Sequence, residues 1–409
     1  MMKRKNYWFL FAVLLLSLTS LSPSLDFAYN NKLNDTKDPS RLLSPDSPDL
    51  TMNQQPIQIT VQLSAEDFAQ LQQKNEGFMR VTGIQTELSN IALDSNKLVD
   101  SLALGEGPDV MLVNSEDMYS LATKGYLLPV ESYRKHSPES NGLSAILSLM
   151  EWNGYQWGTP YDMDPYVLLW QPLALEALGF HQPPKTVQEW NDLLEKYQES
   201  KGEYLLAIES EQPYGLATLL GEVGGDISNP EDESLNWIEQ ALPYMYIMDK
   251  HIEEWKEMTK ESVPLVISPY SNAAVVQKRG MLLELSDNVY AKHPILLRSR
   301  SLAVSSHSVL PEQAAEWIAY MTSPTTQMEW LKATHRLPVL TSLYNHSSSS
   351  SIVLSITLNK LLENSEEVNT KSIQSNDLST LTDNVDQLLK GLITKKEFKD
   401  NIRANESIN

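Results

Sequence analysis

The sequence predicts an α/β protein made of two domains. Predicted strands alternate with predicted helices along most of the chain, an order that is typical of sheets with helices packed on their faces. The 409 residues are enough for two domains of ordinary size, each with its own hydrophobic core. Apolar residues make up 41% of the chain and charged residues 21%, so the composition is that of a globular protein.

The alternation is clearest where the folded part begins. Between residues 57 and 63 apolar and polar side chains alternate, which predicts a strand with one buried face. Ser64 can cap the following helix, which carries acidic residues in its first turn and ends at Gly83. A second strand is expected over residues 84–88. A third, over residues 109–113, is apolar enough to be buried on both faces.

A carboxylate follows the third predicted strand. Ligands of parallel α/β sheets bind beyond the carboxyl ends of the strands, and Glu116 occupies that position. Glu116 is therefore a candidate ligand contact. An acidic residue in this place can instead cap a helix, and the residues alone leave both interpretations open.

The central stretch, residues 157–170, combines aromatic rings with carboxylates. An Asn-Gly pair within residues 152–157 predicts a hairpin directly before it. Tyr161, Asp162 and Asp164 then precede an apolar run that is typical of a buried strand. Aromatic faces stack on the C–H faces of sugars, and carboxylates accept hydrogen bonds from hydroxyls. These three residues are candidates for lining a ligand cleft, and ordinary core positions are the alternative.

The second half of the chain continues the same alternation. Residues 186–189, Thr-Val-Gln-Glu, form a capping box at the start of a helix. A proline at residue 311 begins another helix, which is expected to end at Ser323 and Pro324. Further strands are expected over residues 204–208, 264–268 and 302–304, and further helices over residues 237–249, 252–258 and 378–392.

Charge and residue content exclude several functional classes. The formal net charge of −21 argues against nucleic acid or an anionic membrane surface as the main partner. The chain has no cysteine, and its seven histidines lack metal-ligand spacing, so no metal or other cofactor is expected. No nucleophile elbow or phosphate loop occurs, so the chain is not expected to be an enzyme. A glycosidase with two carboxylates is the enzymatic alternative.

The N-terminus has the features of an export signal. Basic residues precede an apolar run over residues 7–18, which is shorter than the roughly 20 residues that span a membrane. A cleaved signal is therefore expected within residues 1–28. No clear cleavage site follows, so an uncleaved anchor on the outer face of the cytoplasmic membrane is the alternative. Residues 29–55 are rich in Asn, Asp, Ser and Pro and are expected to form a flexible tether.

Several motifs follow one another in an informative order. A helix leads into Gly-Glu-Gly-Pro-Asp at residues 105–109, and Gly-Tyr-Leu-Leu-Pro-Val follows at residues 125–130. Paired prolines then precede Thr-Val-Gln-Glu-Trp within residues 182–190, and a Pro-Glu-Gln-Ala-Ala helix starts at residue 311. Over most of residues 57–400 this order resembles the extracellular solute-binding proteins of ABC importers, in the family that includes maltose-binding protein.

The resemblance implies a fold and a division of the chain. It implies a periplasmic-binding-protein-like α/β fold, in which two lobes are joined by crossover strands and close on a ligand in the cleft between them. The implied N-terminal lobe comprises residues 56–162 and about 295–325. The implied C-terminal lobe comprises residues 163–294 and about 326–409.

The resemblance also implies ligand contacts. Glu116 falls where the maltose-type proteins place an acidic contact. Gln212-Pro213-Tyr214 resembles their Glu-Pro-Tyr, so Tyr214 would stack on a sugar, and Tyr270 resembles a stacking tryptophan that follows a proline. Together with the central stretch, the expected ligand contacts are Glu116, Tyr161, Asp162, Asp164, Tyr214 and Tyr270.

The implied function is capture of a small solute, above all a sugar or oligosaccharide, and its delivery to the permease subunits of an ABC transporter. The protein is expected to work outside the cytoplasm as a monomer and without a cofactor. A membrane-anchored ligand sensor or partner-binding subunit on the same fold is the alternative. Several departures leave the solute open: glutamine replaces the acid at residue 212, and residues 200–300 are short for the family.

Overall fold

The computed structural model describes residues 55–92, 97–133, 143–210, 212–248, 263–272, 281–284, 294–344 and 375–406. All of them belong to one compact unit, residues 53–409. The expected export signal, all but the last residue of the expected tether, and the expected helix at 252–258 lie outside the described residues.

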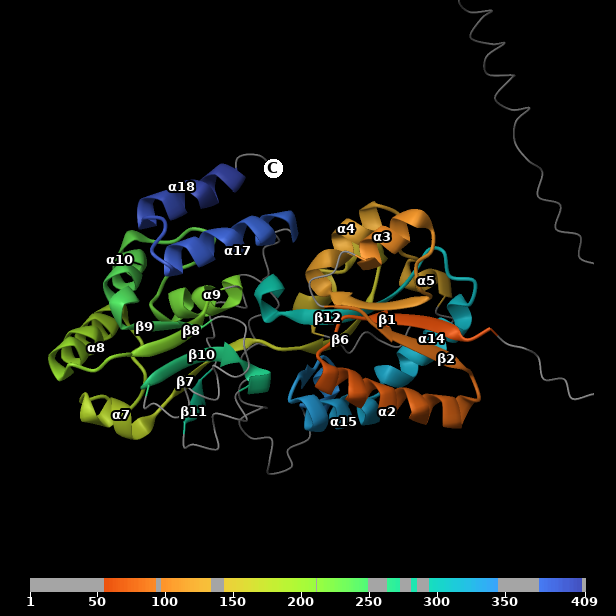
Figure 1. Ribbon diagram of the computed structural model, residues 1–409, viewed down its shortest axis with the longest axis horizontal. Coiled ribbons are helices and arrows are strands. Elements are labelled where there is room, and N and C mark those ends of the chain that lie inside the picture. The colour runs from red at the N-terminus through yellow and green to blue at the C-terminus, as the bar shows by residue number, and fades with distance from the viewer. Residues whose placement is uncertain are drawn as a thin grey trace, which may run out of the picture. The chain divides into compact units, whose positions relative to one another are not determined.

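A six-stranded mixed sheet forms the first lobe (Figure 1), with the strand order β13-β6-β12-β3-β1-β2. Strand β1 runs parallel to β2 and β3, whereas β12 runs antiparallel to β3 and β6. The strands are β1 (Ile57–Val61), β2 (Thr86–Asn90), β3 (Val110–Asn114), β6 (Thr159–Met163), β12 (Ser299–Val304) and β13 (Leu337–Pro338).

Helices cover both faces of the first sheet. In the view of Figure 1, α3 and α4 lie above it and α2 and α15 below it. The Ser64 side chain caps α2, because its hydroxyl oxygen accepts a hydrogen bond from the backbone N–H of Asp67 at 3.1 Å. The helices are α2 (Ala65–Thr82), α3 (Lys97–Leu104), α4 (Met118–Thr123), α5 (Val130–Tyr133), α6 (Ser144–Ser148), α14 (Pro311–Met321) and α15 (Pro324–Thr334), with a 3₁₀ turn η1 (Ser115–Asp117) after β3.

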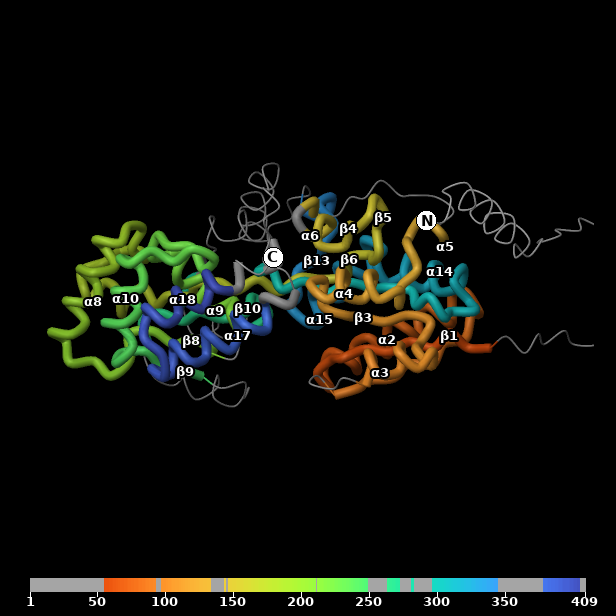
Figure 2. Tube along the Cα trace, turned by 90° about the horizontal axis from the view of Figure 1, so that it is seen from above, coloured from red at the N-terminus to blue at the C-terminus, as the bar shows by residue number. Residues whose placement is uncertain are grey.

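A five-stranded sheet forms the second lobe, with the strand order β11-β7-β10-β8-β9. The strands are β7 (Tyr166–Trp170), β8 (Leu206–Glu209), β9 (Met245–Met248), β10 (Leu265–Pro269) and β11 (Leu282–Glu284). Its helices are α7 (Pro172–Ala177), α8 (Val187–Ser200), α9 (Pro213–Glu222), α10 (Asp232–Ala241), α17 (Ser375–Leu389) and α18 (Lys395–Glu406). Figure 2 shows α17 and α18 beside α9 and α10.

Smaller elements complete the described chain. The expected hairpin is present, with β4 (Glu151–Trp152) paired to β5 (Tyr155–Gln156). Asn153 and Gly154 between them both have positive φ, at 53° and 76°, as the tightest hairpin turns require. The remaining 3₁₀ turns are η2 (Leu242–Tyr244), η3 (Pro294–Leu297) and η4 (Thr341–Leu343).

The chain crosses between the sheets in the central stretch. Strand β6 ends at Met163 in the first sheet, and β7 begins at Tyr166 in the second, so only Asp164 and Pro165 connect them. Strand β12 brings the chain back to the first sheet, where Arg300 lies opposite Asp162 of β6. The side chains at these crossings are therefore shared by both lobes.

The predicted α/β fold class is confirmed, because the chain forms two main sheets, one in each lobe, and helices pack against both. The capping box is also present: Thr186 accepts from the Glu189 N–H, and the Glu189 carboxylate accepts from the Thr186 N–H. The helix expected over residues 237–249 is wrong in its second half. Pro243 cannot continue the helical hydrogen bonds, so α10 ends at Ala241, and β9 follows in parallel pairing with β8.

The division between the lobes also differs from the expectation near residue 326. Helix α15 packs against α2, and β13 pairs with β6, so residues up to Pro338 belong to the first lobe. Trp330 fixes this placement, because its side chain is fully buried in the core of that lobe. The second lobe takes up the chain again at α17, which packs on α9.

Candidate functional site

Glu116 and Tyr214 come from different lobes and meet directly. Glu116 lies in the 3₁₀ turn that follows β3, and Tyr214 lies in the first turn of α9, where Pro213 occupies an initial helical position. The Tyr214 hydroxyl donates a hydrogen bond to Oε1 of Glu116 at 3.1 Å. The structure thus brings together two of the residues that the sequence analysis singled out.

The Glu116 carboxyl group is held in an environment that disfavours its charge. Burial raises its pKa from the ordinary value of 4.5 to about 8, and the neighbouring Asp117 acts in the same direction. The hydrogen bond from Tyr214 and the positive charge of Arg298 oppose this shift without cancelling it. Glu116 is therefore mainly protonated near pH 7.

A second tyrosine and carboxylate stand beside the first pair. The rings of Tyr166 and Tyr214 stack with centroids 5.6 Å apart and planes 29° apart. The Tyr166 hydroxyl donates to Oε2 of Glu209 at 2.6 Å. Both rings are buried, and burial raises the pKa of both phenols well above the usual value. Each phenol is thus a neutral donor to a carboxyl group.

Arg298 adds a guanidinium beside these rings. Its central carbon lies 5.8 Å from the centroid of the Tyr166 ring, and its Nη1 atom lies 3.7 Å from Oδ2 of Asp164. Burial lowers the pKa of Arg298, but Tyr166, Asp164 and Glu209 outweigh burial, so the pKa is raised. Its backbone is left-handed, with φ at 48°, which costs an L-residue roughly 1–2 kcal/mol. We call the group Glu116, Tyr166, Glu209, Tyr214 and Arg298 the tyrosine cluster.

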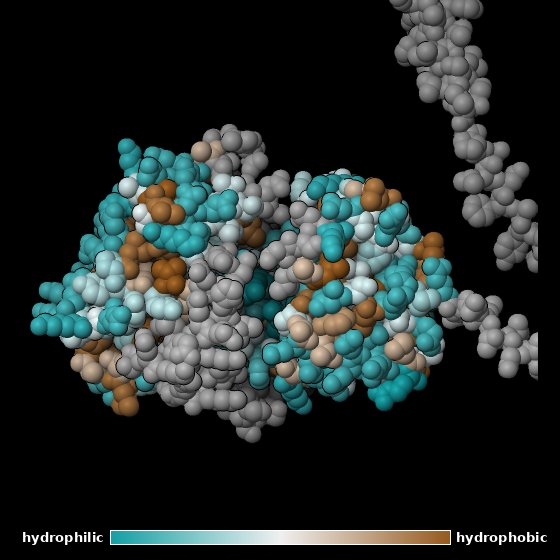
Figure 3. All heavy atoms as spheres, in the orientation of Figure 1, coloured by the Kyte–Doolittle hydropathy of each residue, from teal (hydrophilic) through white to brown (hydrophobic). Residues whose placement is uncertain are grey.

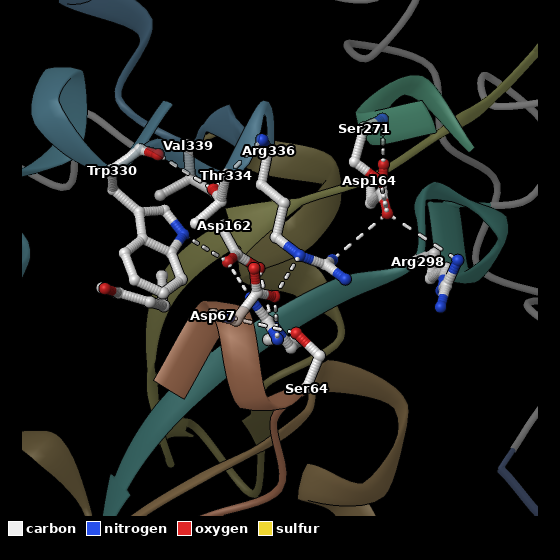
Figure 4. A network of polar contacts seen from close by, with 12 residues as sticks. Ser64, Asp67, Asp162, Asp164, Ser271, Arg298, Trp330, Thr334, Arg336 and Val339 are labelled. Atoms are coloured by element: carbon white, nitrogen blue, oxygen red, sulfur yellow. Dashed lines mark hydrogen bonds and ion pairs between the residues drawn. The ribbon is translucent and has the colours of Figure 1, made fainter. Parts of the chain in front are cut away.

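A network of ion pairs lies next to this cluster (Figure 4). Asp162 is fully buried in β6 and accepts two hydrogen bonds from the Arg300 guanidinium, one of them from Nε at 2.9 Å. The Trp330 indole donates to the same carboxylate at 2.8 Å. Burial alone would raise the pKa of Asp162, but Arg300, Arg336 and the indole outweigh it, so the pKa is lowered.

Asp164 is the next buried carboxylate of the network and ties the end of β10 to the first lobe. It accepts from the backbone N–H of Ser271 at 2.8 Å and from the Ser271 hydroxyl at 2.9 Å. Nη1 of Arg336 lies 3.2 Å from its Oδ2, and Nε of Arg336 donates to Asp67 at 3.2 Å. We call the group Asp67, Asp162, Asp164, Arg300 and Arg336 the crossover network.

The two remaining predicted residues lie apart from these groups. Tyr161 is buried in the core of the first lobe, with its ring 5.2 Å from that of Trp330, and its hydroxyl has no hydrogen-bond partner among the described residues. Tyr270 is half-buried after β10, where its backbone N–H donates to the Pro165 carbonyl at 2.9 Å. Burial raises the pKa of Tyr270 to about 12.

The expected contacts therefore differ in their surroundings. Glu116 and Tyr214 join the lobes directly, whereas Asp162 and Asp164 are engaged with arginines, and Tyr161 packs in the core. That any of them contacts a solute stays a prediction. Sequence patterns did not predict Tyr166, Glu209 or Arg298 as site residues. A signal existed for Glu209, because it follows a predicted strand as Glu116 does.

The site offers hydrogen-bonding groups rather than reactive ones. Phenols and a guanidinium donate, carboxyl groups accept, and aromatic rings provide apolar faces. In the described ranges no group of three or more His, Asp or Glu side chains could hold a metal ion. Figure 3 shows a hydrophilic recess between the two lobes. Across the part of the chain that the structure describes, no helix has the length and apolarity to span a membrane.

Comparison with solved structures finds proteins of the same fold. The GacH receptor of Streptomyces glaucescens, solved unliganded and with acarbose, superimposes with a TM-score of 0.69 at 16% identity, covering 85% of this chain and 96% of that chain. UgpB of Mycobacterium tuberculosis, solved with glycerophosphocholine, gives 0.68 at 14% identity, covering 87% and 98%. The sugar-binding protein MalE of Xanthomonas citri gives 0.66 at 14% identity, covering 86% and 96%.

Sequence comparison identifies the family. No curated protein matches the chain in sequence. Identities of this size between solved structures show only a shared fold, which is the periplasmic-binding-protein fold expected from the sequence. Residues 64–352, which are most of the chain, match the family described as bacterial extracellular solute-binding protein. The chain therefore belongs to the bacterial extracellular solute-binding proteins, a family of binding proteins rather than of enzymes.

Proposed function

We propose that this protein captures a sugar or oligosaccharide outside the cytoplasm, closes its two lobes over it, and delivers it to the permease of an ABC transporter. The observation that carries the proposal is the hydrogen bond between Tyr214 of the second lobe and Glu116 of the first. A solute held between these residues would contact both lobes at once only in the closed form. Binding would then favour closure.

The chemistry of the tyrosine cluster supports a sugar. Sugars present apolar C–H faces and many hydroxyls that both donate and accept hydrogen bonds. The stacked pair of Tyr166 and Tyr214 supplies aromatic faces, and Glu209 and Arg298 supply an acceptor and a donor.

Several proteins of the same fold are known with sugars. GacH was solved with acarbose, and a protein of Bifidobacterium longum, with a TM-score of 0.67 at 15% identity, was solved with lacto-N-biose. UgpB was solved with glycerophosphocholine, which makes that phosphodiester the most informative competing probe. The proposal of a sugar thus agrees with most, but not all, of these neighbours.

The proposal includes a place of action. The family is extracellular, and the basic and apolar residues before residue 19 have the pattern of an export signal. We propose that the N-terminal segment is an export signal that is cleaved, and an uncleaved tether to the outer face of the cytoplasmic membrane is the alternative. Fractionation of cells that express the full chain tests this: a tethered protein sediments with membranes and is released by protease, whereas a cleaved one is found in the medium.

A thermal-shift screen tests the proposed solute class. Glucose, maltose, maltotriose and lacto-N-biose serve as sugar probes, with glycine, spermidine and glycerophosphocholine as probes of other classes. A solute at about a hundred times its dissociation constant adds roughly 2.7 kcal/mol of stability, which such a screen detects readily. Stabilisation by a sugar supports the proposal. Stabilisation by only glycine, spermidine or glycerophosphocholine contradicts it.

A further inference from the structure

Three arginines lie where the lobes are joined, and they are engaged to different degrees. Arg300 donates two hydrogen bonds to Asp162, and Arg336 donates to Asp67 while lying 3.2 Å from Asp164. Their side chains are 11% and 14% exposed. The Arg298 side chain is 34% exposed, and the ion contact that it makes within the described residues, with Asp164, is 3.7 Å long.

The donors of Arg298 remain unused within the described part of the chain. No N–H of its guanidinium makes a hydrogen bond to a described residue, although a guanidinium carries five such donors. Asp164 has little remaining capacity to accept hydrogen bonds from Arg298. Its carboxylate already accepts two from Ser271 and lies closer to Arg336 than to Arg298. The Arg298 guanidinium thus has donors that a ligand from outside the chain can use.

The backbone supports a specific role for this side chain. Arg298 has φ at 48°, in the left-handed region that Gly or Asn occupies at lower cost. Its carbonyl oxygen accepts from the Asp164 N–H at 3.1 Å, which holds the unusual conformation in place at the crossing. A strained position that carries a long, charged side chain beside a candidate site is typical of a functional residue.

The surroundings decide which solute group this guanidinium can bind. Glu209 accepts from the hydroxyl of Tyr166, the ring beside which Arg298 lies, and its Oε1 atom accepts no hydrogen bond from a described residue. Donor and acceptor therefore both adjoin Tyr166, near enough for Glu209 to act on the charge of Arg298. A hydroxyl can satisfy both, because it accepts from Arg298 and donates to Glu209. An acidic group only accepts and would be repelled by Glu209, while an ammonium only donates and would be repelled by Arg298.

We propose that Arg298 determines the solute class of this site, by donating its parallel N–H groups to two neighbouring hydroxyls of an uncharged sugar. Glu209 accepts the hydroxyl protons of the same sugar and excludes its acidic counterparts. The inference rests on the proposed function and restricts its solute class to neutral sugars, as distinct from uronic acids and sugar phosphates. The fork of two parallel donors is what separates arginine from lysine here.

Isothermal titration of the full-length protein tests this inference. Glucose, maltose and lacto-N-biose are the neutral probes, glucuronic acid and glucose 6-phosphate the acidic ones. The variants are Arg298→Gln, Arg298→Lys and, as the control, Arg80→Gln, which removes an exposed guanidinium of α2. Hydrogen bonds to a charged group are worth enough that Arg298→Gln should weaken binding of the best neutral probe about 10- to 100-fold. Circular dichroism confirms that each variant is folded.

A lysine variant, a surface control and a deoxy sugar test the inference further. Arg298→Lys should recover only part of the affinity, because it restores the charge without the fork, and Arg80→Gln should bind as the wild type does. A deoxy analogue of the best neutral probe that lacks one of the two bound hydroxyls should bind wild type weakly and lose little more in Arg298→Gln. Unchanged affinity in Arg298→Gln, or acidic probes that bind as tightly as neutral ones, would overturn the inference. Wild type that binds none of the sugar probes would contradict the proposed function instead.

Discussion

The crossover network and the tyrosine cluster contain similar residues but use them differently. In the crossover network, Asp162 is saturated by Arg300 and Trp330, and Asp164 by Ser271 and Arg336. In the tyrosine cluster, the Arg298 guanidinium makes no hydrogen bond to a described residue, and the Glu209 carboxylate accepts one from the described residues, from Tyr166. Saturated buried charges fix the position of the chain, because each would be costly without its partner. Unsaturated polar groups around aromatic rings are instead suited to binding.

The largest effect should follow from breaking the crossover network. Asp162→Ala leaves the buried Arg300 guanidinium without its main partner, and loss of one member of a buried pair typically costs about 3–5 kcal/mol. In urea denaturation, the midpoint concentration of the variant should be lower than that of the wild type, in keeping with this loss of unfolding free energy. The control is Asp232→Ala, which removes an exposed partner of Lys399 and should leave the midpoint nearly unchanged. Equal midpoints for Asp162→Ala and wild type would show that the network does not stabilise the fold.

A smaller effect, on binding rather than stability, is expected in the tyrosine cluster. Tyr214→Ala removes both the ring that stacks on Tyr166 and the donor to Glu116, so affinity for the sugar found in the screen should fall by about 2 kcal/mol, or about 30-fold. Tyr119→Ala, on an exposed ring of α4, is the control and should not change affinity. Fluorescence titration measures both. An unaltered dissociation constant for Tyr214→Ala would remove Tyr214 from the site.

The raised pKa of Glu116 gives the tyrosine cluster a loss of stability toward alkaline pH, whereas the lowered pKa of Asp162 gives the crossover network a loss of stability toward acidic pH. Between the ordinary pKa of 4.5 and the folded-state value of about 8, the native protein keeps a proton that the unfolded chain releases. Stability should therefore fall as pH rises through this range. Glu116→Gln has no proton to release, so it should be more stable than wild type at pH 8–9 by about 1–2 kcal/mol, reduced from the full shift by partial exposure, and equal to it near pH 4.

Urea denaturation at several pH values measures this difference. Glu233→Gln, on an exposed glutamate of α10, should follow the wild type throughout. A stability difference between Glu116→Gln and wild type that stays constant from pH 4 to pH 9 would show that the Glu116 carboxyl group titrates normally.

The smallest effect should come from trimming the crossover network at its edge. Ser271→Ala removes the hydroxyl donor to Asp164 but keeps the backbone N–H and Arg336, so the loss should be about 1 kcal/mol. The same urea titration measures it. A loss as large as that of Asp162→Ala would mean that the network is not redundant at Asp164.

Local sequence patterns were enough for the parts of the fold that local physics determines. Ser64, Gly83 and the Thr186 capping box marked helix ends correctly, because capping depends on a few adjacent residues. Strand β9 was missed, because its apolar run follows a helix without a glycine, and its pairing with β8 is a tertiary contact. The placement of α15 and β13 in the first lobe likewise depends on packing around Trp330.

The candidate site likewise contains residues that local patterns indicate and residues that only tertiary contacts bring together. Glu116 was singled out because it follows a strand, and Tyr214 because its motif resembles that of a known family. Asp162 was found as a carboxylate, but its partner Arg300 lies 138 positions further along the chain, and no local pattern connects the two. Arg298 gave no signal at all, because its left-handed backbone and its place beside Tyr166 arise only where the chain crosses between the sheets.

The central claim, that a sugar closes the two lobes, is tested most directly by the distance between them. Because the chain has no native cysteine, Leu104→Cys on α3 and Leu173→Cys on α7 can carry a dye pair; these leucines are 74% and 76% exposed. Energy transfer should change when the sugar found in the screen is added to saturation, and should change only at much higher sugar concentration in Tyr214→Ala. A bound sugar that leaves the transfer efficiency unaltered would contradict capture by lobe closure.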